Sequence, residues 1–239
     1  MQAFDIIVVA GQSNAEGCGQ GPAARPYVSD PRICMMPWDS FSIRVAEENP
    51  HDGIPQGNFG LSFAREYVEA GLLAEGRGLL LVQAAVGGTG FLDKRWGPRD
   101  DLYLHMLAMT EAALAPHPEN ELKVLLWHQG ENDSSPKGKA AYAANFGGLV
   151  RGFRGKFNAP GLPFVAGDFV WQWRKKNRCA GKVAAAARAV CEEIGGAFVE
   201  TEGLLSNDEA IGGGDDIHFC RNALHQLGER YFEAYLKMR

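Results

Sequence analysis

The chain has 239 residues, of which 46% are hydrophobic, and its formal net charge is −5 at pH 7. This length and apolar fraction suit one globular α/β domain covering residues 1–239. Basic and acidic residues are interspersed, which argues against a nucleic acid or an anionic membrane surface as the main partner. No apolar run approaches the length of a membrane span.

The cysteines are odd in number and widely spaced, and no Cys-x-x-Cys pair occurs: they are Cys18, Cys34, Cys179, Cys191 and Cys220. This usage disfavours a disulfide framework and a structural zinc site, so we expect reduced thiols. The first residues run directly into an apolar segment, without the basic and hydrophobic regions of a signal peptide. We therefore expect a cytoplasmic protein, with a signal peptide removed before residue 1 as the alternative.

Apolar runs and helical periodicities alternate along the chain. The runs that predict strands are 4–10, 32–36, 79–82, 122–127, 164–170 and 197–199. The segments with helical spacing are 61–73, 102–114, 140–153, 183–194 and 223–236. This alternation predicts a mostly parallel sheet covered by helices on both faces.

A polar turn, Gly11-Gln12-Ser13-Asn14, directly follows the first predicted strand. Such a turn lies at the carboxyl edge of the sheet, where ligands bind in open α/β folds. Gly11 permits a sharp bend, and Asn14 and Glu16 are polar groups that an ordinary buried turn would not need. Taken alone, Ser13 is equally well explained as a helix cap.

A second polar segment near the end of the chain favours a catalytic role for Ser13. Asp215 and His218 follow three consecutive glycines and precede the last predicted helix. A serine hydroxyl needs a base to take its proton, and His218 is the candidate base. The carboxylate of Asp215, three residues earlier, can hold the other ring nitrogen, whereas Asp216 would point elsewhere in an extended segment.

Acyl transfer also needs hydrogen-bond donors for the developing oxyanion. The backbone N–H groups of Ser13 and Gly88 are candidates, because the glycines at 87 and 88 leave the backbone open to close approach. The side-chain amide of Gln129, at the end of the strand 122–127, is a third candidate donor.

These residues occur in the order Gly11-Gln12-Ser13-Asn14, Gly87-Gly88-Thr89, Gln129-Gly130-Glu131-Asn132-Asp133 and Asp215-x-x-His218. In this order they resemble the four blocks of the SGNH-hydrolase superfamily, and specifically its sialate O-acetylesterase-like branch with carbohydrate esterase family 6. The resemblance covers nearly the whole chain. It implies a three-layer α/β/α sandwich with a flavodoxin-like, mostly parallel five-stranded sheet. It also implies hydrolysis of O-acetyl esters without a metal or cofactor.

Carried over by position, the resemblance makes Ser13 the nucleophile and Asp215 and His218 the rest of a triad, with Gly88 in the oxyanion hole. The superfamily uses Asn in its third block, whereas this sequence has Gln129, as the branch does. The other polar residues of the blocks are expected to tie the loops together or to contact substrate: Gln12, Asn14, Glu131 and Asp133.

The loop region 17–58 is rich in Gly, Pro, Asn and Asp, and we expect it to shape the substrate pocket. Its glycines at 17, 19 and 21 superficially resemble a phosphate-binding turn, but Pro22 and Pro26 prevent a helix from starting there. Phe91, Trp38 and Trp96 are candidates for a wall that stacks on a sugar. Trp171 and Trp173, which precede a basic run, suit binding of a sugar or a nucleic-acid strand, or packing in the core.

The predicted function is a serine esterase that removes acetyl groups from a carbohydrate, of the acetylxylan or the sialate type. Two alternatives stay open. A metal-dependent hydrolase would use N and O ligands from the set His128, Glu131, Asp133, Asp215 and His218. A non-catalytic carbohydrate-binding protein on the same fold would have no use for an activated serine.

Overall fold

The fold is built on a seven-stranded sheet in the order β3-β2-β6-β1-β7-β8-β9. The computed structural model describes residues 2–51 and 53–239. The strands are β1 (Phe4–Gly11), β2 (Ile33–Pro37), β3 (Arg44–Val45), β6 (Gly78–Gln83), β7 (Glu121–His128), β8 (Phe164–Gly167) and β9 (Ala197–Val199). Neighbouring strands from β2 to β9 pair in parallel, and the short edge strand β3 runs antiparallel to β2.

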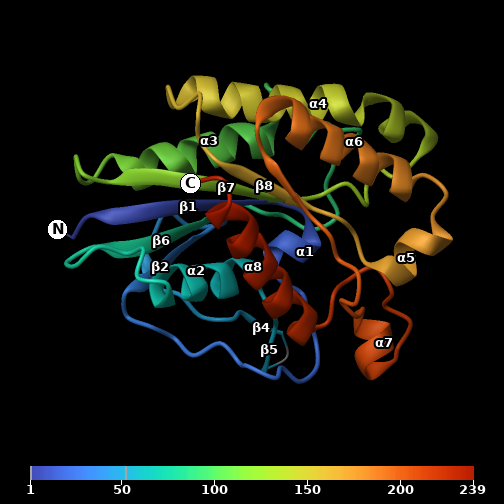
Figure 1. Ribbon diagram of the computed structural model, residues 1–239, viewed down its shortest axis with the longest axis horizontal. Helices are drawn as coiled ribbons and strands as arrows, with labels where there is room; N and C mark the ends of the chain where they lie inside the picture. The colour runs from blue at the N-terminus through green and yellow to red at the C-terminus, as the bar shows by residue number, and fades with distance from the viewer. Residues whose placement is uncertain (1, 52) are drawn as a thin grey trace.

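Two helical layers cover the sheet (Figure 1). The helices of one layer are α3 (Asp101–Leu114), α4 (Pro136–Lys156) and α6 (Ala180–Ile194). Those of the other layer are α2 (Phe59–Glu69) and α8 (Arg221–Leu236). Successive side chains of a strand point to opposite faces, so Val8 joins the core under the first layer and Val9 the core under the second. This double burial explains why β1 is apolar at nearly every position.

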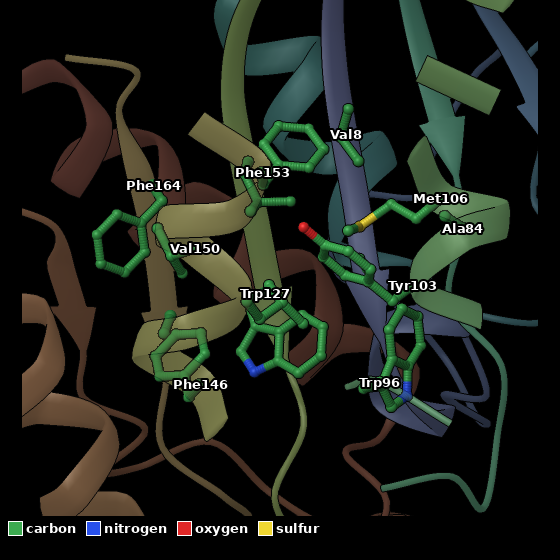
Figure 2. Close-up of a cluster of buried hydrophobic side chains, with 14 of the residues drawn as sticks. Val8, Ala84, Trp96, Tyr103, Met106, Trp127, Phe146, Val150, Phe153 and Phe164 are labelled. Atoms are coloured by element: carbon green, nitrogen blue, oxygen red, sulfur yellow. The ribbon is translucent and has the colours of Figure 1, made fainter. Parts of the chain in front are cut away.

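The core under α3, α4 and α6 is rich in aromatic side chains (Figure 2). Trp127 of β7 packs edge-on against Trp96 at a ring-centroid distance of 5.1 Å and stacks on Phe146 of α4 at 5.7 Å. The indole N–H of Trp96 donates to Thr89 Oγ1 over 2.9 Å. The loop that follows β6 is therefore folded back onto the core.

The strand order creates a switch point at β1. After β1 the chain first adds β2 and β6 on one side and then crosses to add β7, β8 and β9 on the other. A crevice outside the carboxyl ends of the strands at such a point is the usual place for a ligand in this type of sheet. Three short helices lie at that end of the molecule, toward the right of Figure 1: α1 (Ser13–Glu16), α5 (Trp171–Lys176) and α7 (Asn207–Ile211).

The predicted α/β/α layering and mostly parallel sheet are confirmed, but the sheet has seven strands instead of the five that the resemblance implied. The predicted strand 164–170 ends at Gly167, because the Asp168 carboxylate turns back to accept from Phe169 N–H. The predicted helix 61–73 is α2, which starts earlier because the Asn58 side chain caps it. All five cysteines are free thiols.

The loop region 17–58 contains β2, β3 and a small hairpin of β4 (Pro50–His51) and β5 (Ile54–Pro55). It is fixed to α8 by Glu48, whose carboxylate pairs with Arg221 at 2.6 Å and with His225 Nε2 at 2.7 Å. Its role in shaping a pocket stays a prediction. Among the described helices, none is both long and apolar enough to cross a membrane.

Candidate active site

Ser13 is placed by a sharp turn at the end of β1. Gly11 has φ 132°, and a Cβ atom at this position would lie 2.1 Å from the carbonyl oxygen of His128. A residue with a side chain would therefore push β1 away from β7. The chain then enters α1, which begins at Ser13, so the hydroxyl is carried just beyond the carboxyl edge of the sheet.

The structure brings Ser13 together with the two residues from the far end of the chain. His218 Nε2 lies 2.9 Å from Ser13 Oγ, and His218 Nδ1 lies 2.9 and 3.0 Å from the two carboxylate oxygens of Asp215. A carboxylate can only accept, so Nδ1 carries the hydrogen and Nε2 is free to accept from the serine hydroxyl. The side chains of His218 and Asp215 are 28% and 31% exposed, so the group is open to a ligand.

Asp215 is held as a carboxylate. Burial opposes its ionisation, but hydrogen bonds from Asn207 and His218 outweigh this and keep the pKa of Asp215 below its usual value. Asn207 Nδ2 donates to Asp215 Oδ2 over 2.8 Å. Asp216 instead pairs with Lys176 of α5 at 2.5 Å. Its side chain thus points elsewhere, as the sequence analysis predicted.

Asn207 is a residue that the sequence analysis missed. It is the first residue of α7, a five-residue helix that starts with a capping box between Ser206 and Glu209. Its backbone N–H also donates to the carbonyl oxygen of His218 over 2.8 Å. The Ser-x-x-Glu capping box was the readable signal for this helix, but nothing in the sequence pointed from it to Asp215.

Asn14 joins the serine turn to the histidine loop. Its amide nitrogen donates to Ile217 O over 3.2 Å, and its amide oxygen accepts from Phe219 N–H over 3.0 Å. These two bonds bracket His218 in the sequence. Because Asn14 is fully buried and adjacent to Ser13, it fixes the spacing between the hydroxyl and the imidazole.

Glu131 lies behind Asn14, away from solvent. Its Oε1 accepts from Asn14 Nδ2 over 2.9 Å. Burial raises the pKa of Glu131, and the hydrogen bond from Asn14 opposes the shift without cancelling it. Its side chain is 1% exposed, so Glu131 supports Asn14 from behind and is not accessible to a substrate.

Two further histidines, His128 and His225, have structural roles. His128 is fully buried, and its Nδ1–H donates to the Tyr231 hydroxyl, which itself donates to Trp127 O. Burial lowers the pKa of His128 to about 3, so the ring is neutral. His225 lies on α8, with Nε2 on Glu48 and Nδ1 on Arg25 O.

The candidate oxyanion donors Ser13 and Gly88 lie in neighbouring turns. A Cβ placed on Gly87 would be 3.5 Å from Ser13 Cβ, so the turn after β6 packs directly against the serine. Within residues 2–51 and 53–239, neither Ser13 N–H nor Gly88 N–H donates to a protein acceptor. Both donors are therefore free for a ligand oxygen.

Gln129 does not occupy the place predicted for a third oxyanion donor. Its amide nitrogen lies 2.8 Å from Asp133 Oδ2, 3.2 Å from Thr89 O and 3.3 Å from Gln12 Oε1. An amide has two hydrogens, and here protein acceptors occupy both. Gln129 instead ties together the loops that follow β1, β6 and β7.

Gln12 and Asp133 serve the same purpose. Gln12 Oε1 accepts from the backbone N–H of Asn132 over 3.2 Å. The Asp133 carboxylate accepts from the backbone N–H groups of Phe91 and Leu92 over 2.9 and 3.0 Å. Both side chains are buried. Of the two predicted roles, tying loops together and contacting substrate, they fill the first.

The predicted sugar-stacking wall is wrong for two of its three residues. Trp96 and Phe91 are buried in the core, because their loop folds inward onto Trp127. Trp38 follows the carboxyl end of β2 and is 41% exposed. On α5, Trp173 packs against Phe169, and Trp171 lies under the cationic groups of Arg174 and Lys175.

The acidic and histidine residues considered for a metal site do not converge. Over residues 2–51 and 53–239, no three His, Cys, Asp or Glu side chains are grouped so that they could hold a metal ion. The oxygens of Asp133 face backbone N–H groups, and His218 faces Ser13 and Asp215.

A doubly covered parallel sheet that carries a serine, a histidine and an aspartate at its carboxyl edge is the arrangement of SGNH-type esterases. Comparison with known proteins identifies the branch. The sequence model of the family described as "Carbohydrate esterase, sialic acid-specific acetylesterase" matches residues 3–237. The chain therefore belongs to this family of carbohydrate esterases, and it is a carboxylic ester hydrolase that acts on O-acetyl esters of carbohydrates.

Two curated relatives are similar over most of the chain. A probable 9-O-acetyl-N-acetylneuraminic acid deacetylase of Escherichia coli K12 is 25% identical over 226 residues, covering 72% of this chain and 69% of the relative. A probable carbohydrate esterase of Arabidopsis thaliana is 27% identical, covering 97% of this chain and 90% of the relative.

Solved structures share the fold. An Arabidopsis thaliana protein superimposes with a TM-score of 0.79 at 22% identity, covering 99% of both chains. The structure of NanS gives a TM-score of 0.79 at 20% identity, covering 99% of this chain and 97% of the other.

Proposed function

We propose that this esterase works through a covalent acetyl-enzyme formed on Ser13. The observation that carries the proposal is the unbroken hydrogen-bonded chain from Asp215 through His218 to Ser13 Oγ, with distances of 2.9 Å at both links. A base in contact with the hydroxyl and a carboxylate in contact with the base are what an activated serine requires.

In the first half of the reaction, Ser13 Oγ attacks the acetyl carbonyl carbon while His218 Nε2 takes the hydroxyl proton. Asp215 stabilises the imidazolium that forms. The negative oxygen of the tetrahedral intermediate accepts hydrogen bonds from the N–H groups of Ser13 and Gly88. Loss of one such donor typically lowers kcat by about 10²–10³-fold. The bond to the sugar oxygen then breaks, and His218 gives its proton to that oxygen.

In the second half, a water molecule takes the place of the sugar. His218 accepts a proton from the water as its oxygen attacks the acetyl carbon on Ser13. The intermediate collapses, His218 returns the proton to Ser13 Oγ, and acetic acid leaves and loses its own proton to solvent as acetate. The same two N–H donors serve both halves, because both pass through an oxyanion at the same carbon.

Acetate release from p-nitrophenyl acetate tests this mechanism. Ser13→Ala should lower kcat by about 10⁴-fold or more while the melting temperature stays unchanged. A serine-directed phosphonate should inactivate the wild type, and EDTA should have no effect. Full turnover in Ser13→Ala, or loss of turnover to EDTA alone, would contradict the proposal.

For the substrate, we propose an O-acetylated sugar of the sialate type as the first choice, because the Escherichia coli relative is described as a deacetylase of 9-O-acetyl-N-acetylneuraminic acid. The measurement is kcat/KM for this compound and for acetylated xylo-oligosaccharides under the same conditions. A higher value for the xylo-oligosaccharides would reject the sialate assignment and leave the Ser13 mechanism intact.

A further inference from the structure

Glu16 makes a contact beside Ser13 that the mechanism above does not use. It is the last residue of α1, and its Oε2 accepts from the backbone N–H of Gly87 over 2.7 Å. A Cβ placed on Gly87 would lie 2.9 Å from this oxygen and 3.5 Å from Ser13 Cβ. The carboxylate, the turn after β6 and the nucleophile therefore meet at one point.

The turn that Glu16 holds is the one that presents Gly88. On one side of Gly87, the Val86 N–H donates to Gly11 O over 3.1 Å, which anchors the turn to β1. On its other side, Gly88 is exposed, has φ 68°, and directs its N–H to no protein acceptor within the described chain. The bond from Gly87 N–H to Glu16 therefore holds the residue that directly precedes the candidate oxyanion donor.

The position of Glu16 is itself firmly set. Its backbone carbonyl oxygen accepts from Asn58 Nδ2 over 3.0 Å and from Gln83 Nε2 over 3.2 Å. Across the residues that the structure describes, no lysine, arginine or histidine forms an ion pair with its carboxylate. The carboxylate is thus committed to the backbone of Gly87, and a hydrogen bond to an ionised acceptor is stronger than a neutral one.

We propose that Glu16 is a positioning residue for the oxyanion hole: it fixes Gly87 so that the N–H of Gly88 points at the oxygen of the tetrahedral intermediate. The inference rests on the proposed function of Ser13 and deepens it. A donor is useful only where charge develops, and a displacement of about 1 Å can cost up to 10²-fold in rate. The contact therefore matters in the transition state more than in substrate binding.

The test compares Glu16→Ala with Glu16→Gln, using p-nitrophenyl acetate. Glu16→Ala should lower kcat about 10- to 100-fold with little change in KM, because an interaction made in the transition state is lost. Glu16→Gln keeps an oxygen that can accept from Gly87 N–H, so it should recover most of the lost rate. Glu75→Ala is the matched control, since Glu75 is exposed in the turn before β6, at the opposite edge of the sheet.

Gly87→Ala provides a second route to the same contact. The new methyl group would displace the Glu16 carboxylate, so kcat should fall, and the fall should not add to that of Glu16→Ala in the double variant. Melting temperatures of all variants identify any that fail to fold.

Three results would overturn the inference: wild-type kcat in Glu16→Ala, equal losses in the Ala and Gln variants, or a rise in KM alone. Each of them would leave the role of Ser13 untouched as long as Ser13→Ala is inactive. Turnover in Ser13→Ala would instead reject the proposed function itself.

Discussion

At the scale of single residues, the site depends on buried amides that connect loops far apart in the sequence. Asn14 contacts the backbone on both sides of His218 and the carboxyl group of Glu131. No other side chain type of this size offers a donor and an acceptor on one planar group. Asn14 therefore sets the Ser13–His218 distance, although it touches neither reacting atom.

Asn14→Ala should lower kcat about 10- to 100-fold and reduce the free energy of unfolding by about 1–3 kcal/mol, because Phe219 N–H is left buried without an acceptor. Steady-state kinetics and urea unfolding measure the two effects. The control is Asn222→Ala, which removes an amide that accepts from Ala24 N–H at the surface. Equal kinetics in Asn14→Ala and the control would contradict this role.

At the scale of elements, α7 and the glycine loop that follows it form the support for Asp215. Asn207 binds the carboxylate, while Asp208 N–H donates to Asp215 O over 2.9 Å. Gly212, Gly213 and Gly214 have φ of 76°, 97° and 83°, a run of left-handed backbone that residues with side chains rarely adopt. The three glycines of the sequence are thus explained by the path the chain takes from α7 back to His218.

Loss of the amide of Asn207 should change the pH dependence of the enzyme. Its hydrogen bond helps keep the pKa of Asp215 low. The bond therefore stabilises the folded protein above the usual carboxyl pKa, and this stabilisation is lost as the pH falls through the lowered pKa of Asp215. In Asn207→Ala, Asp215 should take up a proton at a higher pH, so activity should fail earlier on acidification.

Asn207→Asp should shift the acidic side of the pH–activity profile further toward higher pH, because a second carboxylate beside Asp215 disfavours the ionisation of Asp215. The measurement is kcat/KM from pH 8 downward for the wild type and both variants. An unchanged acidic limb in both would mean that Asp215 does not govern it.

Sequence patterns predicted some of these elements better than others. Ser13, Gly88, Asp215 and His218 were identified because each lies in a glycine-bearing polar turn after an apolar run or before a helix. Asn207 was missed because α7 has five residues, too few for a periodicity. Trp96 was misplaced because its glycine-rich flanks suggest a surface loop, whereas burial against Trp127 and the bond to Thr89 draw it inward.

At the scale of the whole molecule, a buried ionic cluster joins the first quarter of the chain to the last helix. Glu48 is 5% exposed, and burial opposes its ionisation, but bonds from His225 and Arg221 hold the pKa of Glu48 below its usual value. A region with little regular structure is thereby fixed to α8. Composition predicted a long loop here. It did not predict this anchor, because Arg221 and His225 each lie more than 170 residues after Glu48 in the sequence.

Glu48→Gln should reduce the free energy of unfolding by about 3–5 kcal/mol, because Arg221 and His225 lose their buried counter-charge. Urea unfolding at pH 7 measures this. The control is Glu193→Gln, which breaks an exposed pair with Arg151 and should cost about 1 kcal/mol or less. A loss in Glu48→Gln no larger than in the control would show that the anchor contributes little.

The two reacting side chains, Ser13 and His218, are 205 positions apart along the chain. A ribosome therefore completes nearly the whole sequence before the hydroxyl can meet its base, and no partly synthesised chain that lacks residue 218 can become acetylated through this pair. Recovery of esterase activity after dilution from denaturant would report the joining of the two ends of the chain. Comparing the rate of this recovery with the rate at which tryptophan fluorescence changes during refolding would separate completion of the active centre from burial of the aromatic core.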